Sequence, residues 1–273
     1  MIDKIAVIMS VYSSDKALYL DASLNSIFSQ SYQFFDIYLQ VDGDVDIALR
    51  DVIDLYCNRF SNLSVEYFDS NMGLAWQLNR AITRLRNAGD YQFIARMDAD
   101  DICFPDRFKI QIDYFKSNPS VAVLGSSILE FYEDGRTFVK LMHKEHVLLA
   151  ENIIKRCPFN HPTVMFNMLV LSFDDIEYDP SLMNTQDYYL WVDLLAKGFI
   201  FSNISVPLLK FRVNSNFHSR RGIKKAKNEF FSRVYAMKKL GVFNFTNVTH
   251  TLKLFALRLS PQVVKEFAYK HFR

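Results

Sequence analysis

The sequence predicts an α/β fold with a mostly parallel central sheet flanked by helices. Short apolar runs typical of buried strands alternate with segments whose apolar residues recur every three or four positions, and carboxylates follow where two of these runs end. Strands that alternate with amphipathic helices are typical of βαβ units with right-handed crossovers. With 273 residues, half of them hydrophobic, and only 8 Gly and 7 Pro, the chain can bury a sizeable core. This composition excludes disordered and fibrous classes.

Four strands are predicted in the first hundred residues, over 5–11, 36–41, 63–68 and 93–97. Helical faces are predicted between them, at Leu20, Leu24, Ile27 and Phe28, at Leu49, Val52, Ile53, Tyr56 and Phe60, and at Leu74, Leu78, Ala81, Ile82 and Leu85. Ligands of open α/β sheets bind beyond the carboxyl ends of the strands. Asp42 and Asp98, which each follow a predicted strand, are therefore expected to face one crevice.

The pattern loosens after Asp98. A helix is predicted from Asp106 to Asn118, a strand over 121–131, and a helix near Asp187 that ends at Gly198. From Lys224 onward the chain reads as helical and basic, and Ser260-Pro261 predicts a last helix start before Val264, Phe267 and Ala268. We expect one main domain over 1–219, with halves 1–101 and 102–219, and a basic helical extension over 220–273.

The net charge of +2 hides a strong asymmetry along the chain. Residues 220–273 carry 13 Lys and Arg against 2 acids, whereas residues 1–219 carry 19 basic against 28 acidic residues. A basic tail on an acidic body suggests contact with an anionic partner such as phospholipid headgroups or nucleic acid, and a solvated basic face is the alternative. Arg220, Arg221, Lys224, Lys225 and Lys227 lack the interleaved aromatics of a nucleic-acid module, so no nucleic-acid partner is expected.

The cysteines and the hydropathy pattern bear on the compartment. Cys57, Cys103 and Cys157 are scattered and odd in number, which argues against a disulfide framework and favours a reducing compartment. Cys57 falls on the apolar side of a predicted helix and is expected in the core. The N-terminal apolar run is too short for a signal peptide, and no stretch approaches the roughly 18 apolar residues of a membrane span. We expect a cytoplasmic protein, soluble or peripheral at a membrane.

The run Asp98-Ala99-Asp100-Asp101 is the leading candidate for a metal site. Carboxylates on a tight turn after an apolar strand can hold a hard divalent cation, which can bridge to phosphate oxygens. Asp-x-Asp also occurs at 42–44 and 44–46, and most such triplets are solvated loops. Its place between a strand end and Pro105 favours the run at 98–101.

Several short stretches occur in one order along roughly residues 5–219. They are 5–12 (IAVIMSVY), 41–43 (VDG), 71–73 (NMG) with Asn79, 94–101 (IARMDADD), Pro105 with Arg107 and Gln111, 159–162 (FNHP), 186–191 (QDYYLW), and Phe211-Arg212 with Ser219. As an ordered set they resemble the inverting glycosyltransferases of family 2, which include bacterial enzymes that assemble surface polysaccharides. The resemblance implies the A-type nucleotide-sugar (GT-A) fold, a Rossmann-like arrangement that agrees with the predicted sheet.

The resemblance also implies roles for single residues. Asp42 matches the residue that contacts the nucleotide base, Asp98 the one near ribose and metal, and Asp100 the ligand of Mg²⁺ or Mn²⁺. Asp187 matches the catalytic base, which would take the proton of the acceptor hydroxyl. The implied donor site is completed by Ser10, Tyr12, Asn71, Gly73, Arg96 and Arg212.

His161 and Trp191 are candidates for acceptor binding. A hydrogen-bonded structural histidine and a tryptophan packed in the core are the commoner cases for such residues. Asn71 and Gly73 could shape the donor pocket, although Asn-x-Gly is first of all a turn signal.

The chain departs from the family pattern at three positions. Gln186 stands where relatives carry the Glu before the base, and this removes one carboxylate from the site. Ser10 replaces a common Pro, and Asn214 replaces a histidine that can assist metal or phosphate binding. His218 is a possible substitute for that histidine.

The expected function is metal-dependent, inverting hexosyl transfer from a nucleotide diphosphate, taken as a UDP-sugar, to a glycan hydroxyl. The expected acceptor is a lipid-linked oligosaccharide in O-antigen or capsule synthesis, met at the cytoplasmic face of the membrane through the basic tail. Two alternatives stay open: a catalytically silent nucleotide-sugar binder, which Gln186 makes conceivable, and a phosphatase that uses Asp-x-Asp. The second is disfavoured because its motif would belong to the first strand, not the fourth.

Overall fold

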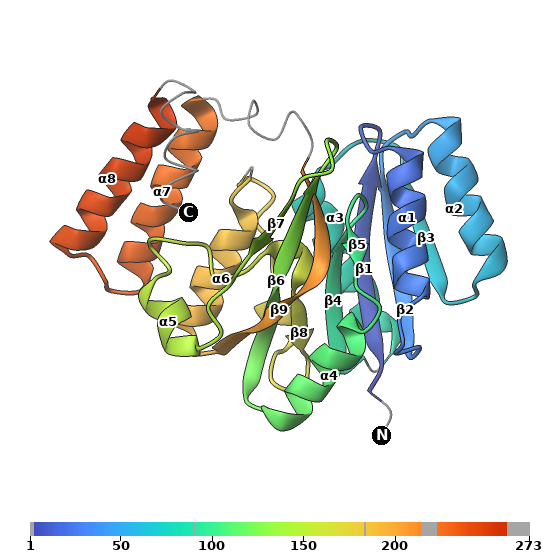
Figure 1. The fold of residues 1–273 in the computed structure, drawn as a ribbon, viewed down its shortest axis with the longest axis horizontal. Coiled ribbons are helices and arrows are strands. Elements are labelled where there is room, and N and C mark those ends of the chain that lie inside the picture. Colours follow the sequence, from blue (N-terminus) through green and yellow to red (C-terminus); the bar gives the residue numbers. More distant parts are fainter. Residues whose placement is uncertain (1–2, 90, 183, 214–222, 261–273) are drawn as a thin grey trace.

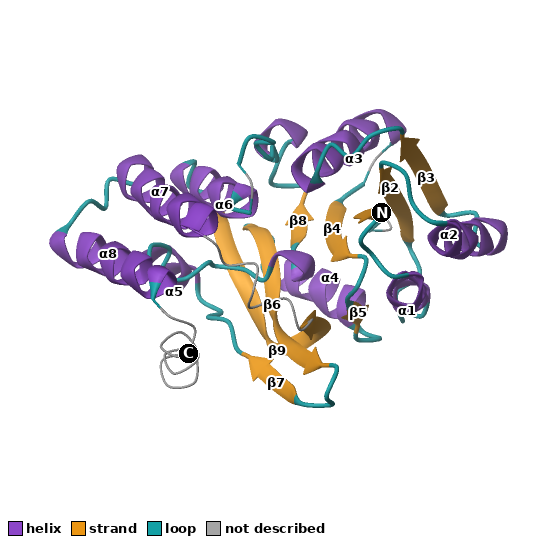
Figure 2. Cartoon of the chain, turned by 90° about the horizontal axis from the view of Figure 1, so that it is seen from above, coloured by secondary structure: helices purple, strands orange, loops and turns teal. Residues whose placement is uncertain are grey.

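The computed structural model describes residues 3–89, 91–182, 184–213 and 223–260. Predictions that concern Asn214, His218, Ser219, Arg220, Arg221 and the segment from Pro261 to Ala268 therefore lie outside the described residues. Within the described part, helices cover both faces of one mixed sheet (Figures 1 and 2). The predicted fold class, α/β with a mostly parallel sheet flanked by helices, is confirmed.

The first half of the chain alternates strand and helix as predicted. Its elements are β1 (Ile5–Tyr12), α1 (Ala17–Phe28), β2 (Phe35–Asp42), α2 (Ile47–Arg59), β3 (Leu63–Phe68), α3 (Leu74–Ala88) and β4 (Phe93–Asp98). Strands β3, β2, β1 and β4 pair in parallel in that order, so β1 lies between β2 and β4. Tyr12 pairs with Asp42 and Ser10 with Asp98, which brings both predicted carboxylates to the same edge of the sheet.

The second half extends the sheet beyond β4. Its elements are β5 (Ile102–Cys103), α4 (Arg107–Ser117), β6 (Val121–Tyr132), β7 (Thr137–Lys140), α5 (His146–Glu151), β8 (Met165–Asn167), α6 (Gln186–Ala196), β9 (Ile200–Val213), α7 (Ile223–Lys239) and α8 (Phe245–Leu259). Strand β8 is antiparallel to both β4 and β6, whereas β6 and the long β9 are parallel. The long β9 returns the chain to the acidic turn after β4, because β5 pairs with β9.

Two hydrophobic clusters fill the space on the two faces of the sheet. One packs α1, α2 and α4 against residues such as Val7 and Leu39, and the other packs α3 and α6 against residues such as Ile8 and Ile94. Residues 7 and 8 of β1 point to opposite faces because strand side chains alternate. The apolar run of β1 is thus buried on both sides, as expected for an interior parallel strand.

One predicted core residue is misplaced. The buried face of α2 consists of Leu49, Ile53 and Tyr56, and Cys57 is exposed. The position after Tyr56 turns by about 100° around the helix axis and leaves the face that meets the sheet. The expectation that Cys57 is a core residue is therefore wrong.

At its C-terminal end the described chain forms a pair of helices. Helices α7 and α8 lie side by side at one end of the molecule, with α7 next to α6 (Figures 1 and 2). The prediction of a helical, basic segment from Lys224 is confirmed, and Ser260 ends α8. None of the described helices combines the length and the apolar character that crossing a membrane requires.

Candidate active site

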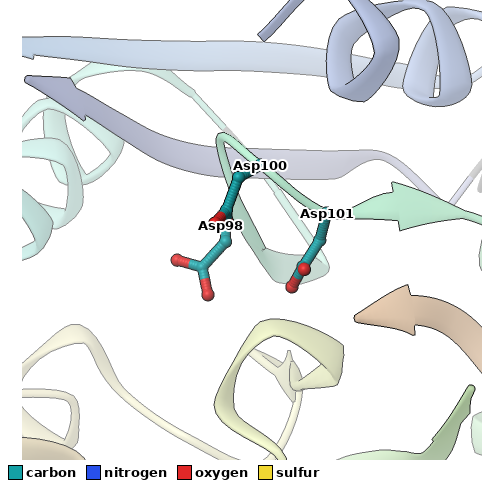
Figure 3. Close-up of side chains that lie close together, drawn as sticks. All are labelled: Asp98, Asp100 and Asp101. Atoms are coloured by element: carbon teal, nitrogen blue, oxygen red, sulfur yellow. The ribbon is translucent and has the colours of Figure 1, made fainter. Parts of the chain in front are cut away.

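The acidic turn after β4 gathers three carboxylates. Oxygens of Asp98, Asp100 and Asp101 all lie within 4.8 Å of one another, and the three side chains point to the same side of the turn (Figure 3). Burial and, to a smaller extent, the neighbouring Asp98 raise the pKa of Asp100 to about 6. Burial and these two neighbours also raise the pKa of Asp101. Three carboxylates this close repel one another, so a cation between them would be strongly favoured.

The last part of β9 holds this turn in place. The backbone N–H of Arg212 donates to Asp101 Oδ1 at 2.9 Å, and Arg212 Nε donates to the backbone oxygen of Asp100 at 3.0 Å. The guanidinium of Arg212 lies over the ring of Tyr19, 3.8 Å from its centroid. Arg212 was predicted to bind the donor. In the structure Arg212 forms hydrogen bonds to Asp100 and Asp101 of the acidic turn, and direct contact with a donor stays a prediction.

The donor atoms of this turn suit a hard divalent cation. Asp101 is fully buried, yet its Oδ2 has no hydrogen-bond partner among the described residues. A buried carboxylate oxygen without a partner is costly unless a ligand satisfies it. Carboxylate oxygens are the ligands that Mg²⁺ and Mn²⁺ prefer. The residues therefore fit the cation that the sequence predicts, with Asp101 in addition to Asp98 and Asp100.

Arg96 connects the acidic turn with the first turn of α6. Its side chain is almost fully buried and forms an ion pair through Nη2 with Asp98, while Nε and Nη1 have no partner among the described residues. Burial lowers the pKa of His161 and the positive charge of Arg96 adds to this effect, while the same charge opposes the increase in the pKa of Asp187. Residues of β4 and α6 that are almost ninety positions apart thus act on one another through Arg96.

Asp187 lies in the first turn of α6 and is partly buried. Burial raises its pKa, and the backbone N–H of Tyr188 and the charges of Arg96 and Arg233 act in the opposite direction. A carboxylate that is ionised but has a raised pKa is a better proton acceptor than an exposed one. The charge of Arg96, which pairs with Asp98, also acts on the pKa of Asp187, and the convergence of Asp187 and the acidic turn on one cleft stays a prediction.

Asp42 is tied to the loop that follows β3. Its Oδ1 accepts from the backbone N–H of Met72 at 2.7 Å and from Gln77 Nε2 at 2.6 Å, and its Oδ2 accepts from the N–H of Gly73 at 2.9 Å. Gly43 and Gly73 both have positive φ, and a Cβ on Gly43 would meet the backbone nitrogen of Asn71 at 2.9 Å. The carboxylate therefore shapes the loop at 71–73. The contact between Asp42 and a base stays a prediction.

The other two Asp-x-Asp triplets have ordinary structural roles. Asp46 caps α2 by accepting from the N–H of Leu49 at 2.8 Å, and the exposed Asp44 pairs with Arg50 at 2.7 Å. The preference for the run at 98–101 over these triplets is consistent with this arrangement.

Sequence reasoning missed Asp15, which belongs to the loop after β1. Its Oδ2 accepts from the N–H of Tyr12 at 3.0 Å, and burial together with the charges of Asp100 and Asp98 raises its pKa to about 7. Asp15 thus adds a fourth acid to the electrostatic field of the acidic turn. The available signal was its position just past the end of β1, the strand between β2 and β4.

The two predicted acceptor residues differ in their surroundings. His161 Nε2 lies 2.9 Å from the hydroxyl of Tyr178, and the amide of Asn79 fixes the backbone of Tyr178 on both sides. Trp191 is fully buried, with its ring centroid 5.0 Å from that of Phe159 and 5.9 Å from that of His161. A ring enclosed in this way offers no face to a sugar, so the prediction that Trp191 binds the acceptor is wrong. Trp191 belongs to the core because Val192 and Leu194 beside it are buried as well.

The family is settled by the sequence itself. Residues 6–178 match the family described as "Glycosyl transferase family 2". The chain belongs to this family.

Three relatives match nearly the whole chain. A glycosyltransferase of Haemophilus influenzae described as uncharacterized is 31% identical over 98% of both chains, and the amylovoran biosynthesis glycosyltransferase AmsE of Erwinia amylovora is 30% identical over 98% of both. The UDP-Gal:alpha-D-GlcNAc-diphosphoundecaprenol beta-1,3-galactosyltransferase of Escherichia coli is 28% identical over 98% of this chain and 95% of its own. The chain is thus related to enzymes of bacterial polysaccharide biosynthesis.

Solved structures agree on the fold. S. aureus TarS 1–349 in complex with UDP-GlcNAc has a TM-score of 0.62 at 16% identity and covers 96% of this chain and 83% of its own. The mannosyltransferase PcManGT from Pyrobaculum calidifontis, in complex with GDP-Man and Mn²⁺, has a TM-score of 0.60 at 13% identity and covers 98% of this chain and 79% of its own. The GT-A-type fold implied by the sequence motifs is confirmed.

Proposed function

We propose that the chain is a metal-dependent, inverting glycosyltransferase that moves a sugar from a nucleotide diphosphate, a UDP-sugar, to a hydroxyl of a glycan. One observation carries the proposal. The acidic turn after β4 and the carboxylate at the start of α6 are linked by the buried Arg96, which pairs with Asp98 and acts on the pKa of Asp187. A leaving-group site and a base on opposite sides of one sugar are what inverting transfer needs.

The leaving group is bound on the acidic side. Asp98 and Asp100, with Asp101, would hold Mn²⁺ or Mg²⁺. When bound, the cation supplies positive charge that stabilises the diphosphate as negative charge develops on it. Arg212 keeps the turn in the required shape through its bonds to Asp100 and Asp101.

The proton is taken on the opposite side. Asp187 accepts the proton of the acceptor hydroxyl while that oxygen forms a bond to the anomeric carbon and the bond from this carbon to the diphosphate breaks. Attack from the face opposite the leaving group inverts the anomeric centre without a covalent intermediate. Burial raises the pKa of Asp187 and with it the basicity of the carboxylate, and the charge of Arg96 opposes this increase.

The donor and acceptor contacts follow the same division. We assign the nucleotide to the edge where β1 and β2 end, with Ser10, Tyr12, Asp42, Asn71 and Gly73, and the transferred sugar to the neighbourhood of Arg96 and Asp98. His161, held by Tyr178, would border the acceptor side. We assign Arg212, whose bonds hold the acidic turn, to the donor side as well.

The acceptor we propose is a lipid-linked oligosaccharide, as in O-antigen or capsule synthesis. The name of the E. coli relative includes a diphosphoundecaprenol acceptor, and residues 220–273 of this chain carry 13 basic against 2 acidic residues. Both point to a peripheral enzyme at the cytoplasmic face of a membrane, where the basic tail meets anionic lipid.

The test is a thermal-shift screen of nucleotide sugars with and without Mn²⁺. Because a ligand that binds the native state raises the melting temperature, we expect one class of donor to do so only when Mn²⁺ is present. Addition of acceptor lipids then tests transfer. Metal-independent binding would contradict the proposed site, and binding without hydrolysis or transfer over a broad acceptor panel would favour the silent binder.

A further inference from the structure

Helix α8 has the reverse of the burial pattern expected for a helix in water. The residues buried on α8 are Asn247 and Thr251, 8% and 2% exposed. Phe245, Leu252 and Leu259 are 84%, 51% and 48% exposed. A surface helix normally buries its apolar stripe and exposes its polar face. On α8 the polar Asn247 and Thr251 are thus buried, while the apolar Phe245, Leu252 and Leu259 face outward.

The exposed apolar residues form one continuous stripe. Phe245, Leu252 and Leu259 are spaced by seven residues, so they lie within about 40° of one another around the helix. The exposed Ala256 lies between them on the same face, and the exposed Phe243 precedes the helix. We call Phe243, Phe245, Leu252, Ala256 and Leu259 the outer stripe.

The polar side of α8 is bound to α7 by specific contacts. Arg258 of α8 forms an ion pair with Glu229 of α7 at 2.7 Å. Phe255 packs on Phe230 of α7, with ring centroids 5.2 Å apart. These contacts fix which side of α8 faces the protein, so the outer stripe is not an accident of a loosely attached helix.

The outer face of α7 also exposes apolar side chains. Ile223, Lys227, Phe231 and Lys238 are exposed, and their spacing puts them on one side of the helix. Phe231 is joined to α8 through Phe230, since the rings of Phe230 and Phe231 are 5.7 Å apart. Apolar residues with interspersed lysines are typical of helices that lie in a membrane interface, where the lysine amines reach the headgroups.

We propose that the outer stripe of α8 and the adjoining face of α7 lie in the interface of a lipid bilayer that carries anionic headgroups. The inference rests on the membrane contact proposed above and names the surface that makes it. Charge decides between a bilayer and a second copy of the chain. On the described part of the hairpin Lys227, Lys238 and Lys253 are exposed, while its one acid, Glu229, is paired with Arg258, so two such faces would repel each other, whereas anionic lipid would attract them.

The position of this surface suits transfer to a lipid-linked acceptor. Helix α7 packs against α6, and Lys239 of α7 pairs with Asp193 of α6 at 3.1 Å. Asp187 lies in the first turn of α6, so the helix that carries the base packs directly against α7, one of the two helices proposed to meet the bilayer (Figure 1). The membrane-bound hairpin would thereby keep the acceptor side of the enzyme near its substrate.

The experiment measures binding of the full chain to vesicles, without donor. Vesicles of phosphatidylglycerol mixed with phosphatidylcholine are compared with vesicles of phosphatidylcholine alone, for the wild type and for Leu252→Ser combined with Leu259→Ser. The matched control is Leu18→Ser combined with Leu55→Ser, which changes two exposed leucines on α1 and α2. We expect the wild type and the control to bind phosphatidylglycerol vesicles equally, and the outer-stripe variant to bind about tenfold less.

A fluorescence probe keeps the proposal testable if the serine variant folds poorly. We expect Phe245→Trp to show a blue-shifted emission on phosphatidylglycerol vesicles, and Leu55→Trp to show no additional shift. Equal vesicle binding by all variants would overturn the proposal. So would a wild-type dimer that the outer-stripe change converts to a monomer without any vesicle binding. Because donor is absent, a failure here leaves the thermal-shift test of the transferase itself unaffected.

Discussion

The ends of the N-terminal strands and the outer face of α8 both place residues where an ordinary soluble protein would not. At the strand ends, acids gather in a partly buried turn, and burial raises the pKa of Asp100 and Asp15. On α8, apolar side chains face outward while Asn247 and Thr251 are buried. The first arrangement is unfavourable without a cation and the second is unfavourable in water.

The difference shows that two kinds of structural feature can indicate a ligand. A group of like charges is stabilised by an opposite charge, so its free energy depends on pH and on bound metal ions. An exposed apolar stripe is stabilised when it is removed from water, and the free energy gained depends on the apolar area that is buried. The two regions should therefore respond to different perturbations.

A large loss of activity is expected from Asp100→Asn. Loss of this carboxylate weakens the cation site, and we expect transfer to fall by about 10²–10³-fold, the range for removal of one group that stabilises developing charge. The Mn²⁺-dependent rise in melting temperature should vanish as well. Asp44→Asn, in the exposed triplet, is the matched control and should keep both. Equal losses in the two variants would mean that the turn after β4 is not the metal site.

A smaller but still large effect is expected on stability from Arg96→Met. Removal of one partner from a buried ion pair leaves Asp98 uncompensated and should lower the free energy of unfolding by about 3–5 kcal/mol. The control is Arg50→Met, whose exposed pair with Asp44 should contribute at most about 1 kcal/mol. Chemical denaturation measures both. If the two changes cost the same, Arg96 does not link the two halves of the site.

Leucines in the two regions should differ in their effect on unfolding. Leu39→Ala opens a cavity in the fully buried β2 and should cost about 2–5 kcal/mol. Leu252→Ala on the exposed stripe should change the free energy of unfolding by no more than about 0.5 kcal/mol. Denaturation in the absence of lipid provides the comparison. A large loss for Leu252→Ala would indicate that the stripe packs against the chain itself.

A further effect is the pH dependence of the stability of the metal-free protein. The pKa values of Asp15 and Asp100, about 7 and about 6, lie above the value of 3.8 for free aspartate, so the folded state binds more protons between these values than the unfolded state. Stability should therefore fall as pH rises from about 5 to about 8, and Mn²⁺ should reduce the fall. Asp15→Asn should flatten the upper part of the curve. An identical slope in that variant would exclude Asp15 from the cluster.

The N-terminal half could be predicted closely because its signals are local. Apolar runs and helical periodicity placed β1 to β4 within one residue at either end, and the position of Asp98 after β4 marked the acidic turn. The pairing of β8 with β4 and β6 could not be predicted, because it joins short segments that are distant in sequence. The site residues followed the same division. Asp100 stands in a recognisable run, whereas Asp15 is recognised only when its loop is seen beside that run.

The side of a helix on which a given residue lies was also difficult to predict from the sequence. A periodic pattern shows that a helix forms but not which neighbour each side meets. Trp191 was therefore expected beside the acceptor although it lies in the core, and Cys57 was expected inside although it is exposed. The reversal on α8 is the extreme case, because its charge was evident from the sequence and its outward apolar stripe was not.

The central claim is that Asp187 acts as the base for transfer of the same sugar whose diphosphate is bound at the acidic turn. The most direct measurement is the turnover of Asp187→Asn beside its donor affinity by calorimetry with Mn²⁺. We predict that donor affinity stays close to that of the wild type while transfer falls by about 10²–10⁴-fold, as for loss of a general base. Unchanged turnover in this variant would contradict the account.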